Sequence, residues 1–90
     1  SYDNNNYSNS LYLRFEVKDK QGVLSTITNR LAKFKISVKR IIQTPDKKND
    51  RATIVIITHK TKENNIRNCL SIFKNNKNIV KFPTLIRIYN

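Results

Sequence analysis

The single glycine of the chain, Gly22, lies where an alternating apolar segment gives way to a helical one. Residues 17–24 read Val-Lys-Asp-Lys-Gln-Gly-Val-Leu, so a strand is expected to pass through a tight turn directly into a helix. Glycine accepts a positive φ and a close approach by a ligand because it has no Cβ. This turn therefore constrains the fold, and it is also the first candidate for a binding site.

Apolar periodicity predicts the first elements of the fold. Apolar and polar residues alternate over residues 11–18, which indicates a half-buried strand. Beyond the turn, spacings of three and four predict a helix over about residues 23–34, with one apolar face made of Val23, Leu24, Ile27, Leu31 and Phe34. Residues 1–10 are polar and lack any apolar period, so they predict a disordered linker or tail before a folded domain at residues 11–90.

Two further strands are predicted in the middle of the chain. Ile36, Val38 and residues 41–42 mark the second strand, and the β-branched run at residues 53–58 marks the third. Between them, residues 44–50 contain a proline and several turn formers. We expect these residues to form a mobile hairpin loop, long for its type.

The last third of the chain predicts a second helix and a final strand. Spaced apolar residues indicate a helix over about residues 62–74, with Thr61 as its N-cap. Pro83 cannot donate to a sheet ladder, so the last strand is expected at residues 85–89. The resulting βαββαβ order predicts an α+β, ferredoxin-like fold, in which a four-stranded antiparallel sheet carries both helices on one face.

Size and charge suggest partners. A chain of 90 residues is one small domain that gains stability by pairing with a copy of itself. It contains no apolar run long enough for a membrane span and no apolar signal core, so we expect a soluble, cytoplasmic protein without a membrane partner. The net charge of +12 is compatible with a nucleic-acid-binding module. However, the cations are spread over every predicted element, and the abundance of Lys, Ile and Asn is typical of A/T-rich codons, so nucleic acid is the weaker alternative.

Catalysis and metal binding are not expected within this chain. It has one cysteine, one histidine and six carboxylates, with no recognisable nucleophile and base pair and no thiol cluster for zinc. Cys69 occupies an apolar helical position and is interpreted as a core residue, and His59 as a strand-end or turn residue. An RNA-recognition module shares the βαββαβ order, but residues 53–58 contain neither the aromatic nor the glycine that such modules carry.

The turn at residues 19–24 is the better candidate site. Free N–H groups that open a helix, together with the helix dipole, favour a carboxylate or a phosphate, and Asp19 offers a partner for an ammonium group. A zwitterionic amino acid presents both charges. A purely structural interpretation fits the same residues. Asp19 can cap the helix or shape the turn, and Gly22 can be there only because the turn needs its φ angle.

The turn also resembles a known family. The ACT domain, a βαββαβ regulatory module, commonly has Asp/Asn-x-Pro-Gly-Val-Leu at its first turn, where residues 19–24 read Asp-Lys-Gln-Gly-Val-Leu. Residues 31–38, Leu-Ala-Lys-Phe-Lys-Ile-Ser-Val, are similar to the family's Leu-Ala-x-x-x-Ile-Ser-Ile, and Gln43 follows the second strand. The resemblance covers about residues 11–90.

A narrower resemblance points to one kind of ACT domain. Residues 12–19, 41–43 and 54–59 are similar to the C-terminal ACT domain of bacterial homoserine dehydrogenase. This likeness implies an oxidoreductase parent that reduces aspartate semialdehyde to homoserine with NAD(P), in threonine and methionine biosynthesis. The cofactor-binding and catalytic parts would lie outside these residues, residues 1–10 would be the interdomain linker, and no catalytic residue is carried over.

The family resemblance further implies a regulatory site. Such ACT domains commonly pair side by side as homodimers, bind an amino acid effector at the interface, and act on the catalytic domain of the parent chain. The matching effector-binding residues are Asp19, Gln21, Gly22, Val23, Leu24 and, facing the turn from the partner chain, Ser37. Threonine is the implied effector, as the end product of the pathway. Gln21 replaces the usual proline and loosens the turn, and a dimerisation module with an empty site is the alternative hypothesis.

Overall fold

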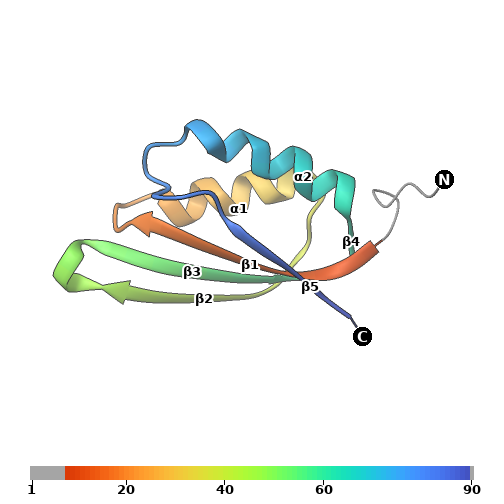
Figure 1. Cartoon of the computed structure of the whole chain (residues 1–90), viewed down its shortest axis with the longest axis horizontal. Coiled ribbons are helices and arrows are strands. Elements are labelled where there is room, and N and C mark those ends of the chain that lie inside the picture. Colours follow the sequence, from red (N-terminus) through yellow and green to blue (C-terminus); the bar gives the residue numbers. More distant parts are fainter. Residues whose placement is uncertain (1–7, 90) are drawn as a thin grey trace.

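Strand β1 is an inner strand of the sheet (Figure 1). The structure is a computed structural model that describes residues 8–89. The apolar side chains of β1 at alternate positions are buried, as the period of two predicts. β3 and β5 pair antiparallel with β1, and β2 pairs antiparallel with β3. The strands are β1 (Ser8–Lys18), β2 (Val38–Asp46), β3 (Arg51–Thr58), β4 (Thr61–Lys62) and β5 (Thr84–Ile88).

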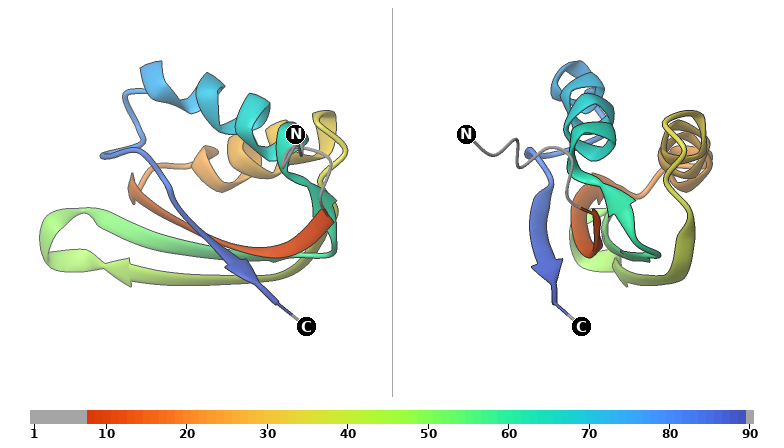
Figure 2. Two further views of the ribbon diagram at one scale, coloured as in Figure 1. Left: turned by 45° about the vertical axis from the view of Figure 1, so that its right-hand side comes forward. Right: turned by 90° about the vertical axis from the view of Figure 1, so that its right-hand side faces the viewer.

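Both helices cover the same face of the sheet, which confirms the predicted α+β, ferredoxin-like arrangement (Figures 1 and 2). Helix α1 (Val23–Lys33) lies over the side of the sheet that ends in β2, and α2 (Glu63–Ile72) lies over the side that ends in β5 (Figure 2). The core fills the space between these layers, and Phe15 and Phe73 meet there edge to face, with ring centroids 5.5 Å apart.

The first strand begins earlier than the sequence predicts. Ser8 and Asn9 pair with β4, a two-residue strand that the apolar pattern does not reveal. The Leu11 N–H donates to the Thr58 Oγ1 at 3.0 Å, which continues this pairing at a buried position. Residues 8–10 therefore belong to the sheet rather than to a linker, and the rest of the predicted linker, residues 1–7, lies outside the described residues.

Two local predictions are wrong at the sheet's connections. Thr61 does not cap α2, because it lies in β4 and Lys62 is the N-cap residue, without a side-chain hydrogen bond. The predicted loop at residues 44–50 is shorter, since β2 continues to Asp46 and a 3₁₀ turn, Lys47–Asn49, completes the hairpin. Pro45 is accepted there because β2 is an edge strand, where a missing N–H costs no ladder bond.

The remaining boundaries agree with the sequence to within one or two residues, apart from the tail of the second helix. The helix predicted over residues 62–74 ends at Ile72 and continues as a 3₁₀ turn, Phe73–Asn75. Ile36 is buried just before β2 rather than inside it, and β5 begins at Thr84. Within residues 8–89, no helix has both the length and the apolar character needed to cross a bilayer.

Candidate functional site

The turn between β1 and α1 requires its glycine. Gly22 is the N-cap residue of α1 and has a φ of 89°, in the left-handed region that residues with a Cβ rarely adopt. A Cβ built on Gly22 would meet no atom within 4 Å, so the space beside this residue is open. The predicted positive φ is confirmed, and the backbone angle rather than crowding demands the glycine.

The first turn of α1 presents unpaired backbone amides. The Val23 N–H donates weakly to the Lys20 carbonyl, at 3.3 Å, whereas the N–H groups of Leu24 and Ser25 have no acceptor among the described residues. The Thr26 N–H and hydroxyl both donate to the Gly22 carbonyl, at 2.9 and 3.0 Å, which fixes the start of the helix. No acidic side chain lies in this first turn, so its positive dipole end is not neutralised from within the helix.

A small hollow of about 140 Å³ lies against this turn. Gln21, Gly22 and Val23 form one side of it, and Thr26 and Ile27 continue along the helix. The opposite side comes from the segment after α2, through Asn76, Asn78 and Ile79. The hollow therefore joins three of the predicted site residues to a segment far away in sequence.

The sequence pattern does not predict the two asparagines of this hollow, Asn76 and Asn78. Backbone bonds hold the segment in place: the Lys18 N–H donates to the Asn78 carbonyl at 2.8 Å, and the Asn78 N–H donates to the Asn76 Oδ1 at 2.9 Å. The βαββαβ topology could have predicted this contact. In that topology α2 runs in the same direction as β1, so the end of α2 must lie near the turn that follows β1.

Asp19 lies in the turn but not in the hollow. Its N–H donates to the Asp50 carbonyl at 2.9 Å, which ties the turn to the end of the β2–β3 hairpin, and its residue is exposed. The side chain does not cap α1, since Gly22 is the N-cap and no side-chain cap bond is formed. The capping interpretation of Asp19 is thus wrong, and its carboxylate is accessible to a ligand at the turn.

Ser37 lies at the other end of α1. It is exposed, directly precedes β2, and its carbonyl accepts the His59 N–H at 2.9 Å. The helix between Gly22 and Ser37 has eleven residues, which at 1.5 Å per residue separates them by about 16 Å. Within one chain, Ser37 and the turn are therefore not brought together.

Cys69 and His59, the two residues outside the turn whose side chains could be reactive, occupy structural positions. Cys69 is fully buried in the core, and this burial raises the pKa of its thiol to about 11, so the thiol is not a nucleophile at neutral pH. His59 is exposed and directly follows β3, as predicted. Among the described residues, no group of three or more His, Cys, Asp or Glu side chains could hold a metal ion.

The uncovered face of the sheet lacks the features of an RNA-binding surface. Its two central strands present Tyr12, Arg14 and Glu16 from β1, and Thr53, Val55 and Ile57 from β3. Glu16 accepts bonds from the Arg14 Nε at 2.7 Å and the Thr53 hydroxyl at 2.6 Å, and although burial raises its pKa, these partners outweigh burial and lower it. Tyr12 is the one aromatic residue that these two strands place on the uncovered face, which is too few for base stacking of the kind that RNA-recognition modules use.

Comparisons with known proteins agree with this geometry. A family model described as "ACT domain" matches residues 11–76. A homoserine dehydrogenase of Helicobacter pylori is 33% identical over 79 residues, which cover 88% of this chain and 19% of that protein. The chain therefore spans about a fifth of the length of this relative.

Solved structures share the fold. A homoserine dehydrogenase from Thiobacillus denitrificans superposes with a TM-score of 0.87 at 24% identity, over 99% of this chain and 19% of that chain. The regulatory subunit of aspartate kinase from Thermus thermophilus gives a TM-score of 0.63 at 17% identity, over 91% of this chain and 52% of that one.

Proposed function

This chain belongs to the ACT domain family, and we propose that it is an amino-acid-binding regulatory domain whose effector is held at the β1–α1 turn. The observation that carries the proposal is the open space beside Gly22, next to the unpaired amides of Leu24 and Ser25. These amides and the helix dipole suit the carboxylate of an amino acid, and the exposed Asp19 suits its ammonium group. The hollow of about 140 Å³ is large enough for a small side chain only.

The proposed parent is an NAD(P)-dependent homoserine dehydrogenase, and the proposed effector is threonine. Support for the parent comes from the relatives of that name, which match most of this chain with a small part of their own length. Threonine is the end product of the pathway in which homoserine is made, and its hydroxyl suits the polar wall that Thr26, Asn76 and Asn78 provide. The proposal places the oxidoreductase chemistry in the parent and none in this domain.

A side-by-side homodimer completes the proposed site. A two-fold axis between neighbouring β2 edges sets the two α1 helices antiparallel, so the start of α1 in one protomer meets the end of α1 in the other. The partner's Ser37 then faces the turn that contains Gly22. Two observations support this pairing: β2 has no neighbour on its outer side among the described residues, and Ile41 and Ile42 on it are 40% and 47% exposed.

Regulation follows if the effector binds two arrangements of this interface with different affinity. A coupling of about 1 to 3 kcal/mol is typical of allosteric pairs of sites. The turn is suited to such a role because Gln21, in place of the family's usual proline, leaves the backbone before Gly22 less constrained and lets binding order it.

The direct test is an NMR titration of the isotope-labelled domain with all twenty amino acids. We expect saturable shifts for threonine at the amides of residues 19–25, at Asn78 and at Ser37. If no amino acid shifts these amides while the dimer stays intact, the regulatory proposal fails and the domain is a pairing module with an empty site.

Substitutions in the turn give the first prediction. Gly22→Val forces a branched side chain to a φ of 89° and should abolish the effector-induced shifts, while the circular dichroism spectrum and the dimer persist. Unchanged binding in a folded Gly22→Val dimer would exclude this turn as the site.

The ammonium contact gives the second prediction. Asp19→Ala should weaken effector affinity by more than about 1 kcal/mol, because a hydrogen bond to a charged group is lost. Asp46→Asn, which removes an exposed charge at the hairpin end of β2 and keeps an acceptor oxygen for Asn49 Nδ2, is the control and should leave the affinity unchanged once the dimer is verified by sedimentation. Equal weakening in both variants would assign the effect to overall charge.

A further inference from the structure

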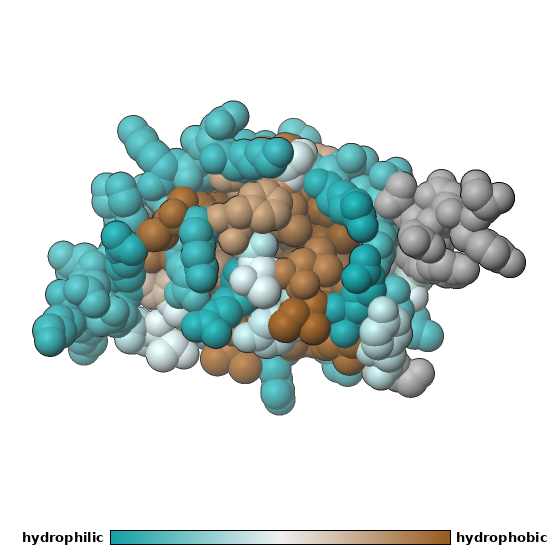
Figure 3. Space-filling view, in the orientation of Figure 1, coloured by the Kyte–Doolittle hydropathy of each residue, from teal (hydrophilic) through white to brown (hydrophobic). Residues whose placement is uncertain are grey.

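A second concave surface lies on the opposite side of the molecule from β2. It is a groove of about 350 Å³ between α2 and β5, with an apolar floor made of Ile66, Leu70, Phe82 and Leu85. Phe82 is 52% exposed, and Figure 3 shows apolar side chains gathered on the face where β5 passes below α2, with hydrophilic residues around them. An exposed apolar patch with a polar rim is typical of a protein interaction site.

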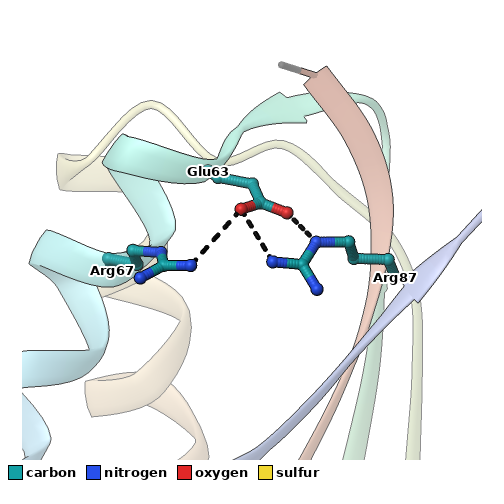
Figure 4. Close-up of polar contacts among 3 residues, drawn as sticks. All are labelled: Glu63, Arg67 and Arg87. Carbon is teal, nitrogen blue, oxygen red and sulfur yellow. Dashed lines mark hydrogen bonds and ion pairs between the residues drawn. The ribbon is translucent and has the colours of Figure 1, made fainter. Parts of the chain in front are cut away.

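The rim of this groove is cationic. Arg67 comes from α2, Lys74 from the 3₁₀ turn that follows it, and Arg87 from β5. The only acidic side chain lining the groove is Glu63, which is 3% exposed and already satisfied: it accepts two bonds from Arg87, one of them at 2.9 Å, and an ion pair from Arg67 at 3.6 Å (Figure 4). The groove therefore carries a net positive charge that favours an acidic occupant.

The length of the groove favours a polypeptide over a metabolite. Its lining residues run from Glu63 to Lys74, along α2 and the 3₁₀ turn after it, which at 1.5 Å per residue is about 16 Å. This length accommodates about five residues of extended chain at 3.3 Å per residue. The groove is thus too long for a single amino acid and has the size of a short strand.

The strand beside the groove has a free edge. β5 pairs with β1 only, so within residues 8–89 its outer N–H and C=O groups have no strand partner. Leu85 and Arg87 pair with the buried Leu13 and Leu11 of β1, which places their side chains on the face that α2 covers. A strand added beside β5 would direct every second side chain toward α2 and into the groove.

We propose that the α2–β5 groove binds an acidic, extended segment of a protein partner, which adds to the sheet as a strand next to β5. The segment carries an apolar side chain at its central position for the floor, and carboxylates two residues before and after it for Arg67 and Lys74. This surface is separate from the effector turn and from the β2 edge, so it stays accessible in the proposed dimer.

Selection from a random twelve-residue peptide library on the immobilised domain tests the proposal. We expect enrichment of peptides with an Asp/Glu-x-apolar-x-Asp/Glu pattern. Bound peptide should slow amide hydrogen exchange at the alternate residues of β5 whose N–H groups point away from β1, because these amides then donate to the added strand. The β2 amides should exchange at an unchanged rate.

Three surface variants make the test specific. Arg67→Glu, at a side chain that is 61% exposed, and Phe82→Ser, at a residue that is 52% exposed, should each weaken the selected peptides at least tenfold without unfolding the domain. Lys39→Glu, on exposed β2, makes the same charge change as Arg67→Glu and should weaken binding less than twofold. Absence of the acidic-apolar pattern, equal weakening by Lys39→Glu, or protection at β2 instead of β5 would each overturn the proposal.

Discussion

The two edges of the sheet differ in length, exposure and anchoring. β2 has nine residues, none of them buried, and joins the rest of the domain through β3. β5 has five residues and is held from two sides, by its pairing with β1 and by the bond from Arg87 to Glu63 of α2. A long edge without a side-chain anchor suits pairing with a second copy, whereas a short anchored edge beside a groove suits a short segment.

The anchor of β5 gives the largest expected effect. Glu63→Gln removes a buried carboxylate from two guanidinium groups and should lower the free energy of unfolding by about 2 kcal/mol, a reduced value because Arg87 remains partly exposed. Glu16→Gln, on the uncovered face with a side chain 24% exposed, is the matched control and should cost about 1 kcal/mol or less. Urea unfolding of both variants measures the difference, and equal losses would contradict a special role for Glu63.

The pairing edge gives the next effect. Ile42→Asp places a charge on the β2 edge that pairs in the proposed dimer and should raise the dimer dissociation constant at least tenfold, or about 1.4 kcal/mol. Ile86→Asp makes the same change at a similarly exposed position of β5, 53% against 47%, and should leave the dimer intact. Sedimentation equilibrium distinguishes them, and dissociation by Ile86→Asp alone would move the interface to the other edge.

Lowering the pH tests the Glu63 anchor of β5, with a smaller expected effect on stability. The hydrogen bond from Arg87, acting against burial, lowers the pKa of Glu63 in the folded state below its usual range. A carboxyl with a lowered folded pKa stabilises the fold fully above its unfolded value of about 4.3, and this contribution is lost as the pH falls through the folded value.

The unfolding free energies of the wild type and of Glu63→Gln should therefore begin to converge as the pH falls below about 4.3, the unfolded carboxyl pKa, and should meet only below the lower, folded value. Chemical unfolding at pH 7, 5, 4 and 3 measures this convergence. A constant difference between the two proteins across that range would show that the ionisation of Glu63 is not the source of its contribution.

Much of the fold was predictable from local pattern. The alternation in β1 and the helical spacing in α1 fix those elements because each buries one apolar face, and Gly22 marks the turn between them. The family resemblance, which depends on that turn, is confirmed by the match over residues 11–76.

What the pattern did not reveal depends on contacts between distant segments. β4 has two residues and exists only because Ser8 and Asn9 pair with it. Glu63 is a charged residue that local pattern places on the surface, yet it is buried because Arg87 lies 24 residues away in sequence and beside it in space. Asn78 reaches the site for the same reason, through topology rather than through any motif.

The effector site itself divides in the same way. Gln21, Gly22 and Val23 line one hollow, whereas Ser37 lies beyond the far end of α1 and is joined to them in the proposal only across the proposed dimer. The central claim is therefore that one binding site is built from two chains.

Mixing two defective chains tests that claim most directly. Gly22→Val disables the turn, and Ser37→Phe blocks the partner's side, so neither homodimer should bind the amino acid that saturates the wild type. After equal amounts are unfolded together and refolded, random pairing gives one intact site in each mixed dimer, and about a quarter of all sites should recover wild-type affinity by calorimetry. Recovery at that level is the result we predict, and no recovery from fully mixed dimers would contradict a site shared between chains.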